Sequence, residues 1–162
     1  MAGSNGNYSR YVYVYNKTRE TFVATEAAVA DNYLRRLIGL LGKTKRWAKL
    51  GRGLWIIPSR GVHSIGMLFP IDLVFLNKER KVVHVEEHFR PFRISKVSLK
   101  ASSVLELPPH TIYRTGTQVG DVLEITSIRK LSNCTPKHEE LLARFASCFD
   151  VCCSRCVSSI AR

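Results

Sequence analysis

The stretch from Gly53 to Leu76, GLWIIPSRGVHSIGMLFPIDLVFL, most constrains how this chain can fold. It is the longest region with few charges, yet Pro58, Gly61, Gly66 and Pro70 interrupt it. Each proline removes a backbone donor and each glycine loosens the backbone, so a helix over this stretch is excluded. The short runs between them are rich in Ile, Val, Leu and Phe, which is typical of buried strands. The stretch therefore predicts several short strands at the centre of the fold.

Further strands are predicted wherever β-branched and aromatic residues gather between turn signals. Together the predicted strands are Tyr11–Tyr15, Phe22–Val29, Leu54–Ile57, Val62–Ile65, Ile71–Leu76, Lys81–Val85, Ser103–Leu107 and Val122–Ile128. An apolar stripe at helical spacing predicts one short helix over about 31–41. Many short strands without alternating strand–helix units indicate a mostly β domain, either a sandwich or a small barrel.

The composition changes near Asn133. Thr135 and Pro136 suit the start of a helix, and apolar residues then recur at helical spacing, namely Leu141, Leu142, Phe145, Phe149, Cys152 and Cys156. We predict a β domain over 10–130 and a cysteine-rich helical extension over 131–162. The apolar stripe of this helix would dock on the β domain, on a partner protein or on a membrane surface.

The charge of the chain favours an anionic partner. The 162 residues carry a formal net charge of +12, a surplus that suits nucleic acid, an anionic membrane face or an acidic polysaccharide. No block of five or six consecutive basic residues appears, so a soluble protein that is simply basic is the alternative.

The location of the protein is predicted from missing signals. No apolar run reaches the ~18 residues that span a bilayer, and residues 1–10 lack the apolar core of a secretory signal. We therefore expect a cytoplasmic protein whose five cysteines are reduced.

A basic loop over 43–52 is one candidate site. A base or sugar could stack on Trp47 beside Lys45, Arg46 and Lys49, which would make the loop a nonspecific nucleic-acid site. The alternative is a solvated loop whose tryptophan packs on the core.

The run His84-Val85-Glu86-Glu87-His88 has the letters of the inverted zincin motif. That motif works only on a helix, whereas the valines around it predict a strand. On a strand the two histidines would lie about 13 Å apart, at roughly 3.3 Å per residue, which is too far for one metal ion. We expect no metal site here.

Four cysteines crowd the predicted C-terminal helix, namely Cys148, Cys152, Cys153 and Cys156. Their spacing lacks two separated C-x2-C pairs, so a structural zinc site is poorly supported. Packing as small apolar residues is the favoured interpretation, and metal capture or lipidation is the alternative.

A third set of residues surrounds the central stretch: Arg60, His63, Asp72, Arg93 and Glu106. The histidine and the carboxylates could serve as acid and base, and the arginines could hold a carboxylate, phosphate or acidic sugar. In the alternative interpretation, His63 and Asp72 satisfy backbone groups inside the fold, and Glu106 pairs with an arginine.

Six blocks carry a resemblance to a known family: RLIGLLG, GLWIIP, GVHSIGMLFPIDLVFLNKERKVVHV, RPFR, SSVLELP and VGDVLEI. Their order and spacing from about Tyr11 to Ile128 resemble the domain of unknown function 192 family of bacteria and archaea. Ser64, Leu68 and the pair Pro109-His110 depart from its pattern, and the loss of an arginine at Leu68 weakens the case for an anion there. The resemblance implies an antiparallel β-sandwich of jelly-roll type, and it implies no established activity or cofactor.

These observations lead to three hypotheses. The first is a non-catalytic module that binds a small or polymeric anion, for example a carbohydrate, near Arg60, His63 and Arg93. The second is an enzyme in which His63 is the base and Asp72 or Glu106 orients it. The third is nonspecific nucleic-acid binding through the loop 43–52. We expect no cofactor.

Overall fold

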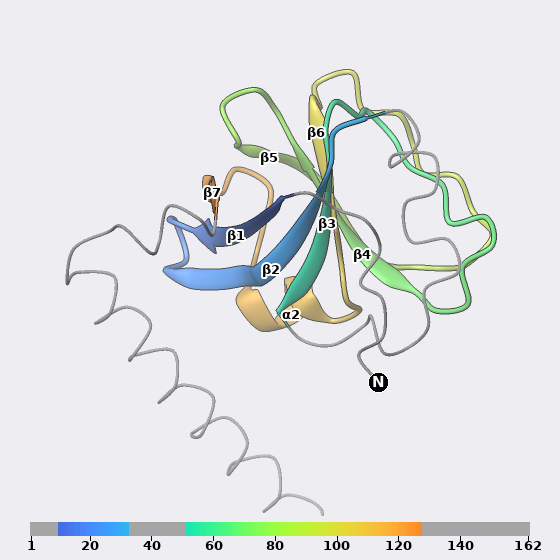
Figure 1. Ribbon diagram of the computed structural model, residues 1–162, viewed down its shortest axis with the longest axis horizontal. Coiled ribbons are helices and arrows are strands. Elements are labelled where there is room, and N and C mark those ends of the chain that lie inside the picture. Colours follow the sequence, from blue (N-terminus) through green and yellow to red (C-terminus); the bar gives the residue numbers. More distant parts are fainter. Residues whose placement is uncertain (1–9, 33–50, 128–162) are drawn as a thin grey trace, which may run out of the picture. The chain divides into compact units, whose positions relative to one another are not determined.

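A computed structural model of the chain describes residues 10–32 and 51–127, which form seven strands and one short helix (Figure 1). The strands are β1 (Tyr11–Asn16), β2 (Thr21–Ala30), β3 (Arg52–Ile56), β4 (Ile71–Leu76), β5 (Val82–Phe89), β6 (Ser103–Leu107) and β7 (Leu123–Ser127), and the helix is α2 (Thr111–Thr115). The mostly β class predicted from the sequence is confirmed. Within these described ranges, no helix has the length and apolarity to cross a membrane.

All seven strands belong to one mixed sheet, in the order β5-β4-β6-β3-β2-β1-β7. Neighbouring strands are antiparallel, except that β2 and β3 run parallel. A parallel pair needs a long crossover, and the residues between Ala30 and Arg52 supply one. The predicted antiparallel sandwich of jelly-roll type is therefore not confirmed.

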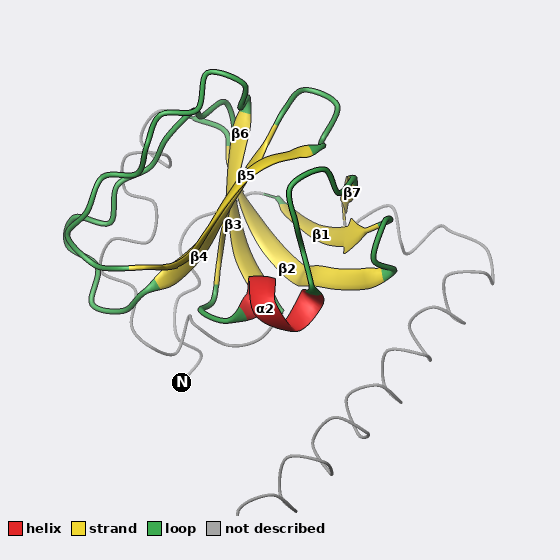
Figure 2. Cartoon of the chain, turned by 180° about the vertical axis from the view of Figure 1, so that it is seen from behind, coloured by secondary structure: helices red, strands yellow, loops and turns green. Residues whose placement is uncertain are grey.

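The sheet curls until its two edges meet at one end, which makes it a half-barrel. Lys81, just before β5, pairs with Val122, just before β7. Around this bridge the amide of Val82 donates to the carbonyl of Asp121 at 2.8 Å, and that of Gly120 donates to Val82 at 2.8 Å. Figure 2 shows α2 beside β2, which it contacts.

Apolar side chains fill both faces of the sheet. The first cluster contains Val74, Leu76, Leu105 and Leu107, and the second contains Ile71, Leu73, Phe75, Leu54 and Val104. Successive residues of β4 thus alternate between the two clusters, as pleating requires. Every residue of β4 is buried, which explains why the central stretch of the sequence is almost continuously apolar.

Most local predictions that fall on described residues agree with the structure. The strand Ser103–Leu107 is confirmed at both ends, but the predicted strand Val62–Ile65 is only a single bridge between His63 and Ile94. Helix α2 was not predicted, because five residues are too few to show a helical period. The predicted helix over 31–41, apart from its first two residues, and the extension over 131–162 lie outside the described residues.

The parallel pair predicts a stability effect at Gly53. A Cβ atom at this position would lie 3.2 Å from Cβ of Ala27 and 3.3 Å from Cδ2 of Leu107. We expect Gly53→Ala to lower the free energy of unfolding by about 1–3 kcal/mol in chemical denaturation, because two strands must move apart. The control is Gly61→Ala, whose Cβ would meet its nearest neighbour at 3.4 Å. Equal stability of the two variants would contradict the close approach of β2 and β3.

Candidate functional site

An open groove of about 940 Å³ lies where the ends of β3 and β4 meet the starts of β5 and β6. Four segments line it: the loop after β3, the β4–β5 hairpin, β5 itself and the loop before β6. The lining residues are Pro58, Ser59, Arg60, Asn77, Lys78, Glu79, Val83, Leu99, Lys100, Ala101 and Ser102.

Hydrogen bonds join two of these segments to the end of β4. The amide of Ser102 donates to the carbonyl of Leu76 at the end of β4 at 2.8 Å, and its hydroxyl donates to the same carbonyl at 3.2 Å. The amide of Ser59 in turn donates to the carbonyl of Ser102 at 2.9 Å. The loop after β3, the end of β4 and the loop before β6 therefore form one fixed framework.

The β4–β5 hairpin follows directly after the end of β4, and the side chain of Asn77 stabilises its turn. Its Oδ1 accepts the amide of Lys81 at 2.9 Å, and its carbonyl accepts the amide of Arg80 at 3.1 Å. Arg80 has a positive φ of 61°. Such local bonds from an asparagine are typical of tight turns, and they place Lys78 and Glu79 at the tip of the hairpin.

The groove has a surplus of positive charge. Arg60, Lys78 and Lys100 come from three different segments, and Glu79 is the one acidic residue among the lining side chains. Within the described part of the chain, none of the three cations forms an ion pair. Cations that no carboxylate neutralises are free to hold a phosphate or carboxylate, and a guanidinium can do so through two hydrogen bonds.

Of the five residues predicted as a site, Arg60 is the one that lines this groove. His63 and Arg93 lie together elsewhere, on two loops that pair with each other. His63 pairs with Ile94, and the amide of the adjacent Ser64 donates to the carbonyl of Arg93 at 2.8 Å. Both side chains are exposed to solvent.

Asp72 is fully buried on β4 and binds backbone amides. One carboxylate oxygen accepts the amide of His88 at 2.9 Å, and the other accepts the amide of Ile112 at 3.0 Å. The residue thereby ties β4 to β5 and to α2. The interpretation of Asp72 as a partner of backbone groups agrees with these contacts.

Glu106 lies on the opposite face of the sheet. Asp72 is paired with Leu107, so its side chain is on the same face as that of Leu107, and the preceding residue points the other way. The Glu106 carboxyl is buried, and among the described residues its Oε2 has no hydrogen-bond partner. Burial raises its pKa to about 8. Asp72 and Glu106 therefore cannot act as one pair, and within the described residues no arginine pairs with Glu106.

The motif from His84 to His88 lies on strand β5, as predicted. The ring of His84 contacts Phe75, with centroids 5.3 Å apart, and that of His88 contacts His110 at 5.6 Å. In residues 10–32 and 51–127 no cluster of three or more histidine, cysteine or acidic side chains could hold a metal ion. Lys45, Arg46, Trp47 and Lys49 of the basic loop lie outside the described residues, as do the four crowded cysteines.

Sequence reasoning missed Lys78 and Lys100 as groove residues. Lys78 lies between the predicted strands Ile71–Leu76 and Lys81–Val85, but nothing local shows that this connection faces Arg60. Only the pairing of β4 with β6 brings the hairpin next to the loop that contains Lys100.

Comparison with known proteins places the chain in a family and a fold. The model of the family described as Uncharacterized ACR, domain of unknown function 192, matches residues 14–125. A UPF0127 protein of Pyrococcus furiosus is 28% identical over 114 residues, covering 67% of this chain and 94% of that protein. A UPF0127 protein of Pyrococcus horikoshii is 28% identical over 100 residues, covering 59% and 83%.

Two solved structures share the fold. One is a Sinorhizobium meliloti protein described as a proposed transcription regulator, with a TM-score of 0.64 and 20% identity over 75% of this chain and 98% of that one. The other is a protein of unknown function from Novosphingobium aromaticivorans, with a TM-score of 0.63 and 18% identity over 76% and 91%. At these identities the likeness concerns the fold alone.

The raised pKa of Glu106 predicts a pH-dependent stability. Its folded-state pKa of about 8 lies above the ordinary value of 4.5. The contribution of Glu106 to the free energy of unfolding is therefore complete below pH 4.5 and is lost as the pH rises toward 8. We expect the free energy of unfolding to fall by roughly 1 kcal/mol per pH unit in this window. Glu106→Gln, which stays neutral, should remove that slope in chemical denaturation across the range. A slope that persists in the variant would assign it to other groups.

Proposed function

The chain belongs to the Uncharacterized ACR family, domain of unknown function 192. This family has no assigned activity, so we propose a function from the geometry of the groove. We propose a non-catalytic binding module for an anionic ligand that Arg60, Lys78 and Lys100 hold. The observation that carries this proposal is the meeting, in one groove, of three cations from three separate segments that form no ion pair within residues 10–32 and 51–127.

The lining of the groove favours a small ligand with both an anionic and a less polar part. Its volume of about 940 Å³ is at the upper end of the range of ligand pockets, roughly 300–1,000 Å³. Val83 and Leu99 offer apolar contact, and the side-chain amide of Asn77 offers a donor beside the cations. A phosphorylated or acidic sugar combines these features.

The groove offers less support for catalysis. The hydroxyl of Ser59 donates to the carbonyl of Gly61 at 2.7 Å, and that of Ser102 donates to Leu76. Neither serine is therefore arranged as a nucleophile next to a base. The enzyme hypothesis rests on His63 with Asp72 or Glu106. Of these, His63 is exposed on a loop, whereas Asp72 and Glu106 are buried.

Nonspecific nucleic-acid binding through the loop 43–52 stays a separate proposal. Its support is the sequence of that loop together with the net charge of +12. A cytoplasmic location is likewise proposed from the sequence.

We also propose that residues 1–130 fold without residues 136–162, since the family match ends at residue 125. A chain stopped at Asn133 is expected to unfold cooperatively in denaturant. Its free energy of unfolding should be unchanged if the extension serves a partner, or lower by about a few kcal/mol if the apolar stripe docks on the sheet. A chain stopped at Asp121, which lacks β7, is the control and should not fold. An unfolded or insoluble chain at Asn133 would contradict the boundary.

The groove itself is tested by replacing its cations. Calorimetric titration at low salt with inorganic phosphate, citrate, a sugar phosphate, a nucleoside monophosphate and an acidic oligosaccharide would identify a ligand. For that ligand we expect Arg60→Gln, Lys78→Gln or Lys100→Gln each to weaken binding about tenfold or more, because each removes a charge-assisted hydrogen bond.

Lys17→Gln is the matched control, because Lys17 is an exposed cation in the turn between β1 and β2. It should bind as the unchanged protein does. If no probe binds, or if the Lys17 variant loses as much affinity as the groove variants, the proposal is wrong.

A further inference from the structure

Two loops outside the sheet form a single structural feature. The loop 60–70 joins β3 to β4, the loop 90–100 joins β5 to β6, and we call them together the paired loops. The amide of Ser98 donates to the carbonyl of Arg60 at 2.8 Å, and that of Ser95 donates to Val62 at 2.9 Å. Figures 1 and 2 both show these loops running side by side and projecting beyond the strands.

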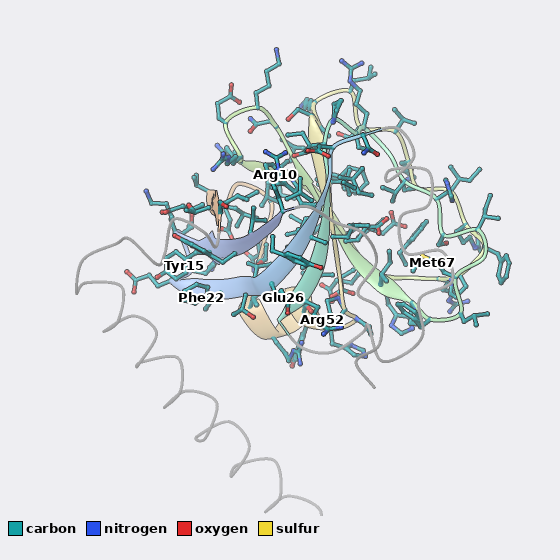
Figure 3. The ribbon with its side chains drawn as sticks, in the orientation of Figure 1. Arg10, Tyr15, Phe22, Glu26, Arg52 and Met67 are labelled. Carbon is teal, nitrogen blue, oxygen red and sulfur yellow. The ribbon has the colours of Figure 1, made fainter. Side chains whose placement is uncertain are left out.

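Buried residues fix the paired loops to the body of the protein. Val62, Met67 and Phe69 belong to the second apolar cluster. Ser64 is fully buried, and its hydroxyl donates to the carbonyl of Arg90 at 2.7 Å and accepts the amide of Arg93 at 2.9 Å. Figure 3 labels Met67, which is buried, in this region. The outer surface of the loops is thus presented by a fixed backbone.

That outer surface is unusually apolar. Among the described residues nine large hydrophobic side chains are exposed, and six of them lie on the paired loops. These six are Ile65, Leu68, Phe92, Ile94, Val97 and Leu99, with exposed fractions between 52% and 80%. Exposed apolar side chains concentrated on two adjoining loops in this way indicate a site of interaction.

Phe92 also adopts a positive φ of 57°, which is a costly conformation for an aromatic residue. The loop holds this ring in solvent although a backbone with a negative φ would have a lower energy. Such strain persists where the surrounding structure determines it, and it is common at binding sites.

Every charged residue of the paired loops is basic. Arg60, Arg90, Arg93, Lys96 and Lys100 are exposed on the paired loops, and neither 60–71 nor 88–105 contains an aspartate or a glutamate. The cations also alternate with the apolar side chains along the sequence Phe92-Arg93-Ile94-Ser95-Lys96-Val97. The centre of a protein–protein interface is depleted of charge, whereas the boundary of an anionic bilayer offers apolar and phosphate contacts at the same depth.

We propose that the paired loops dock on an anionic membrane surface. The apolar side chains enter the boundary between headgroups and acyl chains, and the arginines and lysines bind the lipid phosphates. This proposal does not rest on the ligand groove, because it depends on residues such as Leu68, Phe92, Arg93, Ile94 and Lys96 that do not line it.

The test is sedimentation of the full chain with vesicles of phosphatidylcholine alone and with vesicles that also contain phosphatidylglycerol. We expect binding to the anionic vesicles and little to the neutral ones. Arg93→Gln combined with Lys96→Gln should weaken binding about 25-fold, at about fivefold per cation. The triple variant Leu68→Ser, Phe92→Ser, Ile94→Ser should weaken binding to the anionic vesicles by roughly tenfold or more.

Two controls make the comparison specific. Tyr113→Ser removes a side chain that is 77% exposed on α2, and Lys17→Gln removes a cation from the β1–β2 turn. Both should bind as the unchanged chain does. All substituted side chains are exposed, so each variant is expected to fold, which the cooperativity of its unfolding confirms.

Three results would overturn the proposal. In the first, vesicle binding is equal in the unchanged chain and in both loop variants, which would place the contact elsewhere. In the second, neutral and anionic vesicles bind alike. In the third, the chain ignores vesicles but forms a dimer that the triple serine variant dissociates, which would mean that a second copy covers the paired loops.

Discussion

The burial of β4 on both of its faces is the constraint on which the described structure depends. Every residue of this strand is inaccessible, so one set of side chains has to be covered on each side of the sheet. The curl that brings β5 to β7 closes the sheet around the first cluster, which contains Val74 and Leu76. The second cluster takes Val62, Met67 and Phe69 from the first of the paired loops. That loop must therefore fold back over the sheet, and its prolines and glycines permit such a course.

The two buried carboxyl groups, Asp72 and Glu106, differ in their hydrogen-bond partners although they lie on paired strands of one sheet. Asp72 keeps two backbone amides as partners, which compensates the loss of water around its charge. Glu106, one position before the strand partner of Asp72, points into the other cluster and has no partner for Oε2. Burial without compensation favours the neutral form, which is why its pKa rises to about 8. A buried carboxyl of this kind reduces stability near neutral pH.

The sequence predicts local features of this fold well and non-local ones poorly. The strands Ile71–Leu76 and Ser103–Leu107 follow from residue types within a few positions, and the structure confirms both. The parallel pairing of β2 with β3 depends on a crossover of about twenty residues, and no local signal sets its direction. The opposite facing of Asp72 and Glu106 depends on register, since a shift of one residue reverses a side chain. The binding hypothesis expects His63 and Arg93 to lie close together. In the structure, the pairing of two loops brings them together, not the pairing of strands in the sheet.

Charge and apolar surface contribute in different ways to the two proposed sites, and salt separates them. Arg60 and Lys100 belong both to the groove and to the paired loops, and no carboxylate pairs with either within the described residues. Exposed like charges are screened over a Debye length of about 8 Å at physiological ionic strength, so this clustering costs the folded state little. The same screening weakens every contact that these cations make with an anion. Apolar transfer from water is not weakened by screening. A groove that relies mainly on Arg60, Lys78 and Lys100 should therefore depend steeply on salt, whereas loops that also bury Phe92 and Ile94 should retain part of their affinity.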